Sequence, residues 1–194
     1  MRPAHDRPAG RAQRAPAGQE SETGAGSGAA IERLPLAAVL DDIRSLWNVG
    51  SIFRTADGCG LRKLWLAGIT GAPPRAEITK TALGAEEQVA WDYRADVLEA
   101  IEQARSEGYE PVCVESGEAS ASLDDFRWPE RPCLVLGNEA TGVSPLVLEA
   151  CERRVSIPMC GVKGSFNVAV AFGISAHRAA RALAADHPGV VFRG

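Results

Sequence analysis

The chain has 194 residues, of which 45% are hydrophobic and 24% are charged, and its formal net charge is -4. This composition is ordinary for a globular protein, and the length suits one domain with a sizeable core rather than two catalytic domains. The negative net charge argues against wholesale wrapping of nucleic acid, which relies on Lys and Arg, but it leaves room for a local basic patch.

The first 30 residues differ in composition from the rest of the chain. They are rich in Ala, Gly, Pro, Arg and Ser and show no apolar periodicity. Such a segment cannot bury enough surface to offset the entropy lost on ordering. We therefore expect residues 1–30 to form a disordered tail and residues 31–194 to form the domain.

Several features of the sequence bear on the compartment. The N-terminal segment lacks the apolar core of a secretory signal, and no apolar stretch is long enough to cross a bilayer. The five cysteines show no CxxC spacing, and most lie in apolar runs, where Cys behaves as a small hydrophobe. We interpret them as reduced thiols. A cytoplasmic protein without a membrane partner is therefore expected.

From Leu36 onward, apolar runs predict strands that alternate with helices. The predicted strands span residues 36–40, 64–67, 89–93, 111–114, 133–136 and 155–157. The predicted helices span residues 49–57, 97–108, 145–151 and 167–184. We interpret Asn48 as the N-cap of the first helix, because Asn is a preferred capping residue. The alternation predicts an α/β fold with a mostly parallel sheet flanked by helices.

Three segments place small, amide or charged residues where a strand gives way to a helix, which is where open α/β sheets bind ligands. The first segment runs from Asn48 to Ala56 and contains Arg54. Taken alone, Arg54 fits either a surface charge or an anion clamp. It follows Asn48 by six residues, somewhat under two helical turns, so the two side chains are displaced around the helix rather than stacked.

The second segment, Leu136 to Ser144, has the glycine spacing of a phosphate-binding P-loop but carries Val143 where that loop has its Lys. Hydrolysis of a nucleoside triphosphate is therefore disfavoured. A G-x-G-x-x-G fingerprint is also absent, which disfavours nicotinamide, flavin and open-sheet methyltransferase sites. Glu139 inside this segment is hard to explain as turn chemistry alone.

The third segment, Ile157 to Asn167, combines a strand end, a glycine-containing loop and a helix start. Ser165 alone fits helix capping. Pro158 has no backbone N–H, and Gly161 and Gly164 permit close approach of the backbone. The loop therefore suits a flat ligand edge bound through main-chain groups.

Together, the three segments resemble the SpoU family of ribose 2'-O-methyltransferases within the SPOUT superfamily. The family pattern is Asn-x-Gly followed by Arg-x-Ala, then Leu-Gly-Asn-Glu-x-x-Gly, then Ile-Pro-Met followed by Ser-x-Asn. This chain meets the pattern in order. The resemblance runs from about Leu36 to Ala184.

The resemblance implies a SPOUT-like fold in which roughly Leu134 to Ala184 form a trefoil knot that binds S-adenosyl-L-methionine (AdoMet). It also implies a homodimer with the active site near the subunit boundary, and an RNA substrate, either tRNA or rRNA. The positions that match cofactor binding are Leu136, Gly137, Ile157, Met159 and Ser165. The positions that match catalysis are Asn48, Arg54, Glu139, Ser165 and Asn167.

Transfer of a methyl group from a sulfonium to a ribose oxygen is an in-line displacement. Alignment and exclusion of water then contribute more than a metal ion, and no metal is expected. The resemblance implies that Arg54 assists deprotonation of the 2'-hydroxyl. Because Arg normally stays protonated, we favour a clamp that binds the neighbouring phosphate and stabilises the developing alkoxide. Glu139 and Asn167 would orient Arg54, the hydroxyl or the cofactor.

Two alternatives stay open at this point. One is a catalytically silent RNA-binding protein of the same fold, which the joint presence of Arg54, Glu139, Ser165 and Asn167 argues against. The other is a base methyltransferase of the knotted superfamily. The Arg54 segment favours ribose over base, because base chemistry usually recruits a carboxylate to accept a ring proton.

Overall fold

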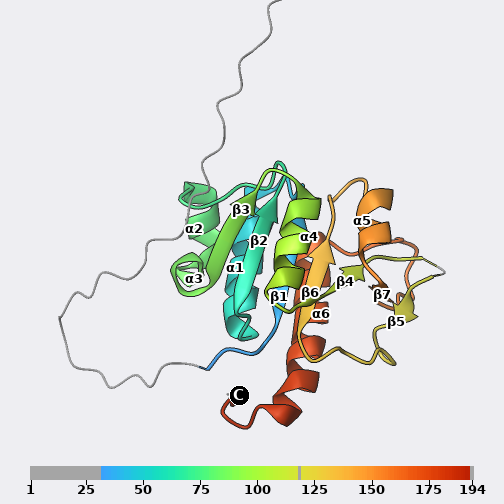
Figure 1. Ribbon diagram of the computed structural model, residues 1–194. Coiled ribbons are helices and arrows are strands. Elements are labelled where there is room, and N and C mark those ends of the chain that lie inside the picture. The colour runs from blue at the N-terminus through green and yellow to red at the C-terminus, as the bar shows by residue number, and fades with distance from the viewer. Residues whose placement is uncertain (1–31, 118, 193–194) are drawn as a thin grey trace, which may run out of the picture.

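The computed structural model describes residues 32–117 and 119–192, so the predicted tail over residues 1–30 lies outside the described residues (Figure 1). The strands are β1 (Ala37–Asp41), β2 (Lys63–Ala67), β3 (Ala90–Arg94), β4 (Glu110–Val114), β5 (Ala121–Ser122), β6 (Pro132–Leu136) and β7 (Arg153–Ser156). The helices are α1 (Leu46–Gly58), α2 (Ala76–Ala82), α3 (Ala85–Gln88), α4 (Val97–Ser106), α5 (Pro145–Ala150) and α6 (Val168–Leu183), followed by the 3-10 turn η1 (Ala184–Asp186). Within the described ranges, no helix is long and apolar enough to cross a membrane.

The strands form one parallel sheet with the order β3-β2-β1-β6-β4-β7-β5. Strand β6 lies between β1 and β4, so segments far apart in the sequence become neighbours; Leu40, for example, pairs with Leu136. Because the strands are parallel, their carboxyl ends meet at one edge, the top edge in Figure 1. The predicted α/β fold with a mostly parallel sheet flanked by helices is confirmed.

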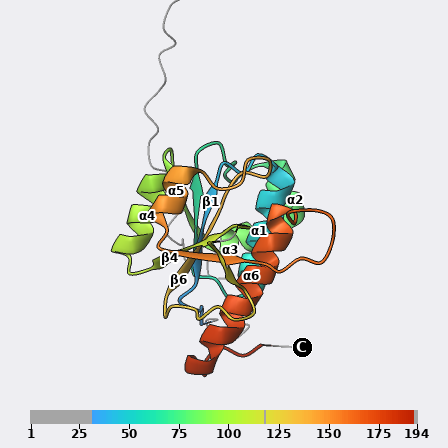
Figure 2. The same ribbon diagram turned by 90° about the vertical axis from the view of Figure 1, so that its right-hand side faces the viewer.

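Alternate side chains of the buried strands pack on opposite faces of the sheet. In β1, Ala38 and Leu40 join the core beneath α1 and α6, whereas Ala37 and Val39 join the core beneath α4 and α5. Phe53 of α1 is fully buried in the first of these cores. Figure 2 shows the resulting layers, with α4 and α5 on one side of the sheet and α1, α2 and α6 on the other.

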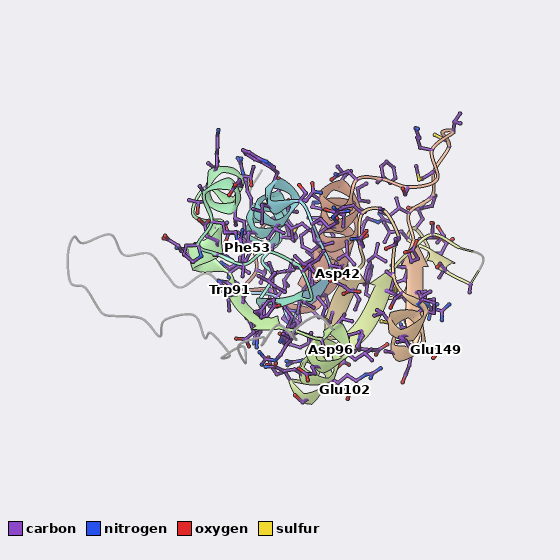
Figure 3. All side chains as sticks on the ribbon, turned by 90° about the horizontal axis from the view of Figure 1, so that it is seen from above. Asp42, Phe53, Trp91, Asp96, Glu102 and Glu149 are labelled. Atoms are coloured by element: carbon purple, nitrogen blue, oxygen red, sulfur yellow. The ribbon has the colours of Figure 1, made fainter. Side chains whose placement is uncertain are left out.

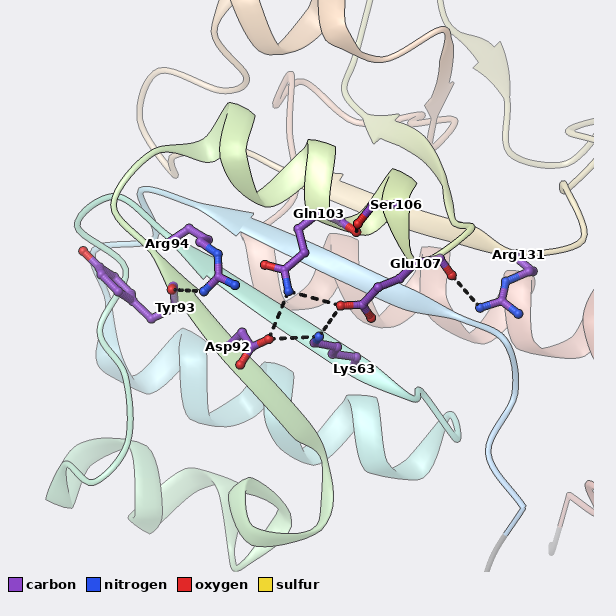
Figure 4. A network of polar contacts seen from close by, with 8 residues as sticks. All are labelled: Lys63, Asp92, Tyr93, Arg94, Gln103, Ser106, Glu107 and Arg131. Atoms are coloured by element: carbon purple, nitrogen blue, oxygen red, sulfur yellow. Dashed lines mark hydrogen bonds and ion pairs between the residues drawn. The ribbon is translucent and has the colours of Figure 1, made fainter. Parts of the chain in front are cut away.

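A polar network fixes strand β3, at the end of the sheet, to its neighbours (Figure 4). The Nζ atom of Lys63 in β2 lies 2.9 Å from a carboxylate oxygen of Asp92 in β3 and 2.7 Å from one of Glu107, just after α4. The Gln103 amide donates to the same two carboxylates, at 3.4 Å and 3.2 Å. Lys63 begins β2, so this network ties α4 to the sheet at the edge opposite the carboxyl ends.

The first helix begins at Leu46 rather than at Val49. Its N-cap is Ser45, whose hydroxyl accepts a hydrogen bond of 3.4 Å from the N–H of Asn48. The prediction that Asn48 caps this helix is therefore wrong. Ser and Asn are both good capping residues, and here the earlier one takes the role. The side chain of Asn48 is left to make contacts outside its own helix.

Three elements have no counterpart among the predicted ones: α2, α3 and β5. Helix α2 buries only Ile78 and Ala82, which is too few apolar positions to produce a helical period in the sequence. The two other elements are shorter still, at four and two residues. The remaining predicted strands and helices agree with the structure to within a few residues at their ends.

Candidate active site

A cavity of about 340 Å³ lies at the carboxyl ends of β4, β6 and β7. Its walls come from the end of β4, the loop after β6, the loop after β7 and the first turn of α6. All five residues predicted to bind the cofactor line it, namely Leu136, Gly137, Ile157, Met159 and Ser165. Small-molecule sites typically enclose about 300–1,000 Å³, so the cavity is large enough for a ligand.

The loop after β6 folds back on itself to form one wall of this cavity. The Oδ1 atom of Asn138 accepts hydrogen bonds from the N–H groups of Ala140 and Thr141, at 2.9 Å and 3.2 Å. The Gly142 N–H donates to the Asn138 carbonyl at 2.9 Å. A β-carbon on Gly137 would lie 2.3 Å from the Gly142 carbonyl oxygen, so a glycine is required where the loop closes. Asn138 is not among the residues predicted from the sequence to form the site.

Glu115, directly after β4, braces the other end of this loop. One carboxylate oxygen accepts a hydrogen bond of 2.9 Å from the Val143 N–H, and the other accepts one of 3.0 Å from the Ser116 N–H. Glu115 also lines the cavity. Glu115 is not among the site residues predicted from the sequence. Its position just after a predicted buried strand was the available signal, because parallel strands end at the same edge as the other site residues.

Glu139 joins the loop after β6 to the start of α1. Its Oε1 atom accepts hydrogen bonds from the Asn48 side-chain amide at 3.0 Å and from the Ser45 N–H at 3.1 Å. Its Oε2 atom accepts one of 3.0 Å from the Arg44 N–H. A negatively charged residue at a helix N-terminus is also favoured by the helix dipole. Glu139 therefore lines the cavity and anchors α1 at the same time.

The hydrogen bonds to Glu139 favour its charged form. Partial burial alone raises the pKa of this carboxyl. The donors from Arg44, Asn48 and Ser45 outweigh that effect, and the pKa of Glu139 falls below its usual value. The side chain is thus a carboxylate at neutral pH, suited to accepting hydrogen bonds rather than to donating a proton.

Asn167 completes the polar network from the opposite side. It is the N-cap of α6, where its Oδ1 atom accepts a hydrogen bond of 3.0 Å from the Ala169 N–H. Its Nδ2 atom donates to Oδ1 of Asn48 at 3.2 Å. Asn48, Glu139 and Asn167 therefore form one connected network between α1, the loop after β6 and α6. Ser165 lies two residues before Asn167 and lines the cavity.

Arg54 is not part of this network. It lies on the exposed side of α1, and its guanidinium makes no hydrogen bond or ion pair with another residue in ranges 32–117 and 119–192. It does not line the cavity either. Six residues correspond to about 600° of helical rotation, so Arg54 and Asn48 point to different sides of the helix. Within a single chain, Glu139 and Asn167 contact Asn48 rather than Arg54.

Several carboxylates lie at the same edge of the sheet (Figure 3). Asp41 ends β1 and is buried, with 9% of its surface exposed. Burial, and the nearby charges of Asp42 and Asp96, raise the pKa of Asp41 to about 6. Figure 3 views this edge from above and shows Asp42 in the middle of the molecule, with Asp96 beside α4, whose N-cap it is.

The parallel sheet, with a ligand-sized cavity at the carboxyl ends of its strands, defines an α/β protein with a candidate small-molecule site. The chain belongs to the SpoU rRNA Methylase family, whose model matches residues 35–177. That match includes the whole of the Asn48, Glu139 and Asn167 network.

Curated relatives share most of this region. The chain is 32% identical over 152 residues to the 23S rRNA (guanosine-2'-O-)-methyltransferase RlmB of Salmonella typhi, which covers 78% of this chain and 62% of that protein. It therefore spans less than two thirds of that relative's length.

Solved structures extend the comparison. An AdoMet-bound rRNA methyltransferase from Sinorhizobium meliloti matches with a TM-score of 0.70 and 27% identity, over 75% of this chain and 56% of that one. A structure described as giving insights into the 2-OH methylation of C/U34 on tRNA matches with a TM-score of 0.68 and 27% identity. It covers 77% of this chain and 97% of that one.

Proposed function

We propose that this protein is an AdoMet-dependent RNA methyltransferase that transfers a methyl group to a ribose 2'-hydroxyl. The observation that carries the proposal is the double role of Glu139, which lines the cavity and also binds the Asn48 side chain. The Glu139 carboxylate therefore connects the ligand cavity to the side-chain amides of Asn48 and Asn167. The names of the Salmonella and Sinorhizobium relatives support both the reaction and the cofactor.

The residues around the cavity fit AdoMet chemically. Leu136 and Ile157 offer apolar surface to a flat base, and Ser165 offers a hydroxyl. The carboxylates of Glu115 and Glu139 give the cavity a negative potential that favours a positively charged ligand. When bound, AdoMet supplies an electrophilic methyl group on a positively charged sulfur.

The polar network would position the ribose beside the cavity. Asn48 and Asn167 share a hydrogen bond, and Glu139 fixes Asn48 from the other side. Such bonds hold the start of α1 and the start of α6 together, which limits the orientations open to a bound nucleotide. Arg54 acts in the proposal as a clamp on the neighbouring phosphate and stabilises the developing alkoxide. It keeps its proton throughout.

We further propose that the protein works as a homodimer in the cytoplasm. Within one chain, Arg54 does not contact the Asn48, Glu139 and Asn167 network and does not line the cavity. In a homodimer, Arg54 of one protomer would approach the cavity of its partner. Phe166, two residues before α6 and at the cavity, and Val170, in the first turn of α6, are 40% and 48% exposed and offer apolar surface to a second copy. Free, buried thiols at Cys59, Cys113, Cys133 and Cys151 support a reducing compartment.

The trefoil knot expected over about Leu134 to Ala184 also belongs to this proposal. From β7, the chain passes along the cavity and then enters α6. Helix α6 packs against α1 and against Leu134 and Leu136 of β6 (Figure 2). The segment between β7 and α6 thus crosses the carboxyl ends of the strands before α6 packs on the sheet. A knotted C-terminal segment would follow such a path.

Two measurements test the function. Isothermal titration of the purified chain with AdoMet should give saturable binding at one site. Incubation with AdoMet and RNA should then make the modified linkage resistant to alkali and ribonuclease, because a 2'-O-methyl group removes the internal nucleophile. Mapping the resistant positions separately in tRNA and rRNA fractions would identify the substrate class.

Three results would count against the proposal. Lack of AdoMet binding would refute it outright. Binding without transfer to any RNA fraction would indicate a catalytically silent RNA-binding protein. Transfer without nuclease resistance would indicate a base methyltransferase.

A further inference from the structure

One side of α1 is unpartnered in the described part of the chain. Trp47, Ser51 and Arg54 lie at the spacing i, i+4 and i+7, which aligns them on one face of the helix. Trp47 is 48% exposed, although it is among the largest side chains in the protein. Arg54 is exposed two turns further along the same face. An exposed Trp in line with a predicted catalytic Arg calls for an explanation.

The packing of α2 against α1 determines the surroundings of Trp47. A β-carbon on Gly50 would lie 2.0 Å from Oγ1 of Thr81 and 2.4 Å from the carbonyl oxygen of Ile78, so only a glycine allows this approach. The Thr81 hydroxyl donates to the Trp47 carbonyl at 3.3 Å. The same packing holds the ammonium group of Lys80 5.5 Å from the centre of the Trp47 ring. A cation at this distance is attracted to the indole and stabilises its orientation.

Further cations flank the exposed side of α1: Arg44 lies two residues before this helix, Arg54 lies on it, and Arg75 is the N-cap of the neighbouring α2. We call Arg44, Trp47, Arg54, Arg75 and Lys80 the Trp47 surface. Arg75 lies close to the start of α1, because a β-carbon built on Gly71 would lie within 4 Å of both the Leu46 and the Arg75 side chains.

The four cations of the Trp47 surface are all exposed. Their side chains form no ion pair with another residue that the structure describes, unlike Arg33, Lys63, Arg105, Arg153 and Arg178 elsewhere. Two carboxylates lie nearby: Glu77 on α2, three residues before Lys80, and Glu139, which accepts a hydrogen bond from the Arg44 N–H. Neither forms an ion pair with the four cations. Four exposed cations without an ion-pair partner among the described residues, in a chain of net charge -4, mark a local site for a polyanion.

We propose that the Trp47 surface binds single-stranded RNA, with an unpaired base stacked on Trp47 and the flanking phosphates held by Lys80 and Arg75. The inference rests on the proposed function and adds the form of the RNA that the enzyme recognises. Aromatic platforms bordered by Lys and Arg are typical of proteins that bind single strands, because every base has a face that can stack. Bases in a duplex are already stacked on one another and are not available to Trp47.

The position of the Trp47 surface relative to the proposed site supports this assignment. Trp47 directly precedes Asn48, and Arg54 follows two turns later, about 10 Å along the helix. A nucleotide bound at Trp47 is thus held close to the network that would position the reacting ribose. An apolar protein partner would not require four exposed cations on this surface, so charge complementarity favours RNA over a protein.

The test compares binding of a short single-stranded oligouridine with binding of an RNA duplex of equal length, by fluorescence anisotropy on the full chain. Trp47→Ala should weaken binding of the single strand about tenfold and leave duplex binding within about twofold. Trp47→Phe should restore most of the loss, because a phenyl ring also stacks. Lys80→Gln should weaken binding of the single strand. It should also reduce, by about one, the magnitude of the slope of log binding constant against log salt concentration.

Leu146→Ala is the matched control, because Leu146 is 65% exposed on α5 and lies outside the Trp47 surface. It should leave RNA binding unchanged. Equal loss of single-strand and duplex binding by Trp47→Ala would overturn the proposal, as would unchanged single-strand binding. Light scattering gives a third check, since a change of oligomeric mass in Trp47→Ala would mean that a second copy of the chain covers the ring.

This experiment can fail independently of the proposed function. AdoMet affinity of Trp47→Ala should equal that of the unaltered chain, because Trp47 does not line the cavity. If the unaltered chain transfers methyl groups but Trp47→Ala binds single strands normally, the methyltransferase stands and the stacking surface is refuted. If single-strand binding depends on Trp47 but no methyl transfer occurs, the surface stands and the proposed function is refuted.

Discussion

Glu139 accepts a hydrogen bond of 3.0 Å from the side chain of Asn48, although 91 residues separate them in the chain. The contact exists because β6 inserts next to β1, which brings the loop after β6 against the start of α1. The same carboxylate lines the cavity. The cavity wall and the start of α1 are thereby linked through the Glu139 side chain, and Asn138 of the same loop adds a hydrogen bond of 2.8 Å to the Asp42 carbonyl.

Replacement of Glu139 tests this coupling. Glu139→Ala leaves the Asn48 amide and two backbone N–H groups without their acceptor, and should lower the free energy of unfolding by about 1–2 kcal/mol. Methyl transfer should fall at least roughly tenfold, because Asn48 loses its fixed orientation. Urea unfolding and single-turnover transfer measure the two effects.

A double-mutant cycle with Asn48→Ala separates the contact from the rest of the Glu139 environment. If the two side chains act through their mutual hydrogen bond, their effects should be non-additive by about 0.5 kcal/mol or more. Glu149→Ala, at an exposed position on α5, serves as the control and should change neither quantity. Fully additive effects of Glu139→Ala and Asn48→Ala would contradict the coupling.

The closure of the loop after β6 predicts a strong effect at Gly137. In Gly137→Ala, the new methyl group would lie 2.3 Å from the Gly142 carbonyl oxygen, so the loop must open. Because this loop forms a wall of the cavity, AdoMet affinity should fall by roughly tenfold or more, measured by titration calorimetry. Gly161→Ala is the matched control, since a β-carbon there meets no atom within 4 Å. Equal affinities for the two variants would show that the loop tolerates opening.

Arg54 should separate binding of the cofactor from chemistry. Arg54→Ala is expected to leave AdoMet affinity near normal, because Arg54 lies outside the cavity, and to reduce methyl transfer by roughly 100-fold or more. Arg54→Lys should recover part of the rate, since it keeps the charge but not the planar fork of donors. Arg127→Ala, at another exposed Arg, controls for loss of surface charge. Equal loss of AdoMet binding and transfer would identify Arg54 as a structural residue.

Local patterns in the sequence were sufficient for most of the fold. Strands such as β1 and β6 are short apolar runs bounded by polar residues, so their existence is readable without any knowledge of their partners. Their order is not. The insertion of β6 between β1 and β4 depends on contacts across about a hundred residues, and no local signal encodes it.

The residues of the candidate site could be predicted from local motifs, but their contacts with one another could not, because those contacts depend on the strand order. The motifs identified Asn48, Glu139 and Asn167 as separate residues, but their connection into one network follows from the strand order. The start of α1 was misassigned because Ser45 and Asn48 are both capping residues. Glu115 was missed because a single Glu after a strand is commonplace at a surface, and its bond to the Val143 N–H is formed only in the folded chain.

Asp41 predicts an unusual dependence of stability on pH. Burial, with help from Asp42 and Asp96, raises the pKa of this carboxyl from 3.8 to about 6 in the folded protein. Between these two values the folded chain holds a proton that the unfolded chain has released. The contribution of Asp41 to the free energy of unfolding therefore falls as the pH rises through this window, by roughly 2–3 kcal/mol in total.

Asp41→Asn keeps the shape of the side chain and removes its charge, so this dependence should disappear. Relative to the unaltered chain, the variant should gain stability between about pH 4 and about pH 7, measured as the difference in urea midpoints at each pH. Asp125→Asn is the control, because Asp125 is exposed and should titrate alike in both states. If Asp41→Asn and the unaltered chain show the same pH profile, the carboxyl is ionised in the folded protein throughout the range. Its burial would then have to be offset by a compensating positive charge at the carboxyl end of β1.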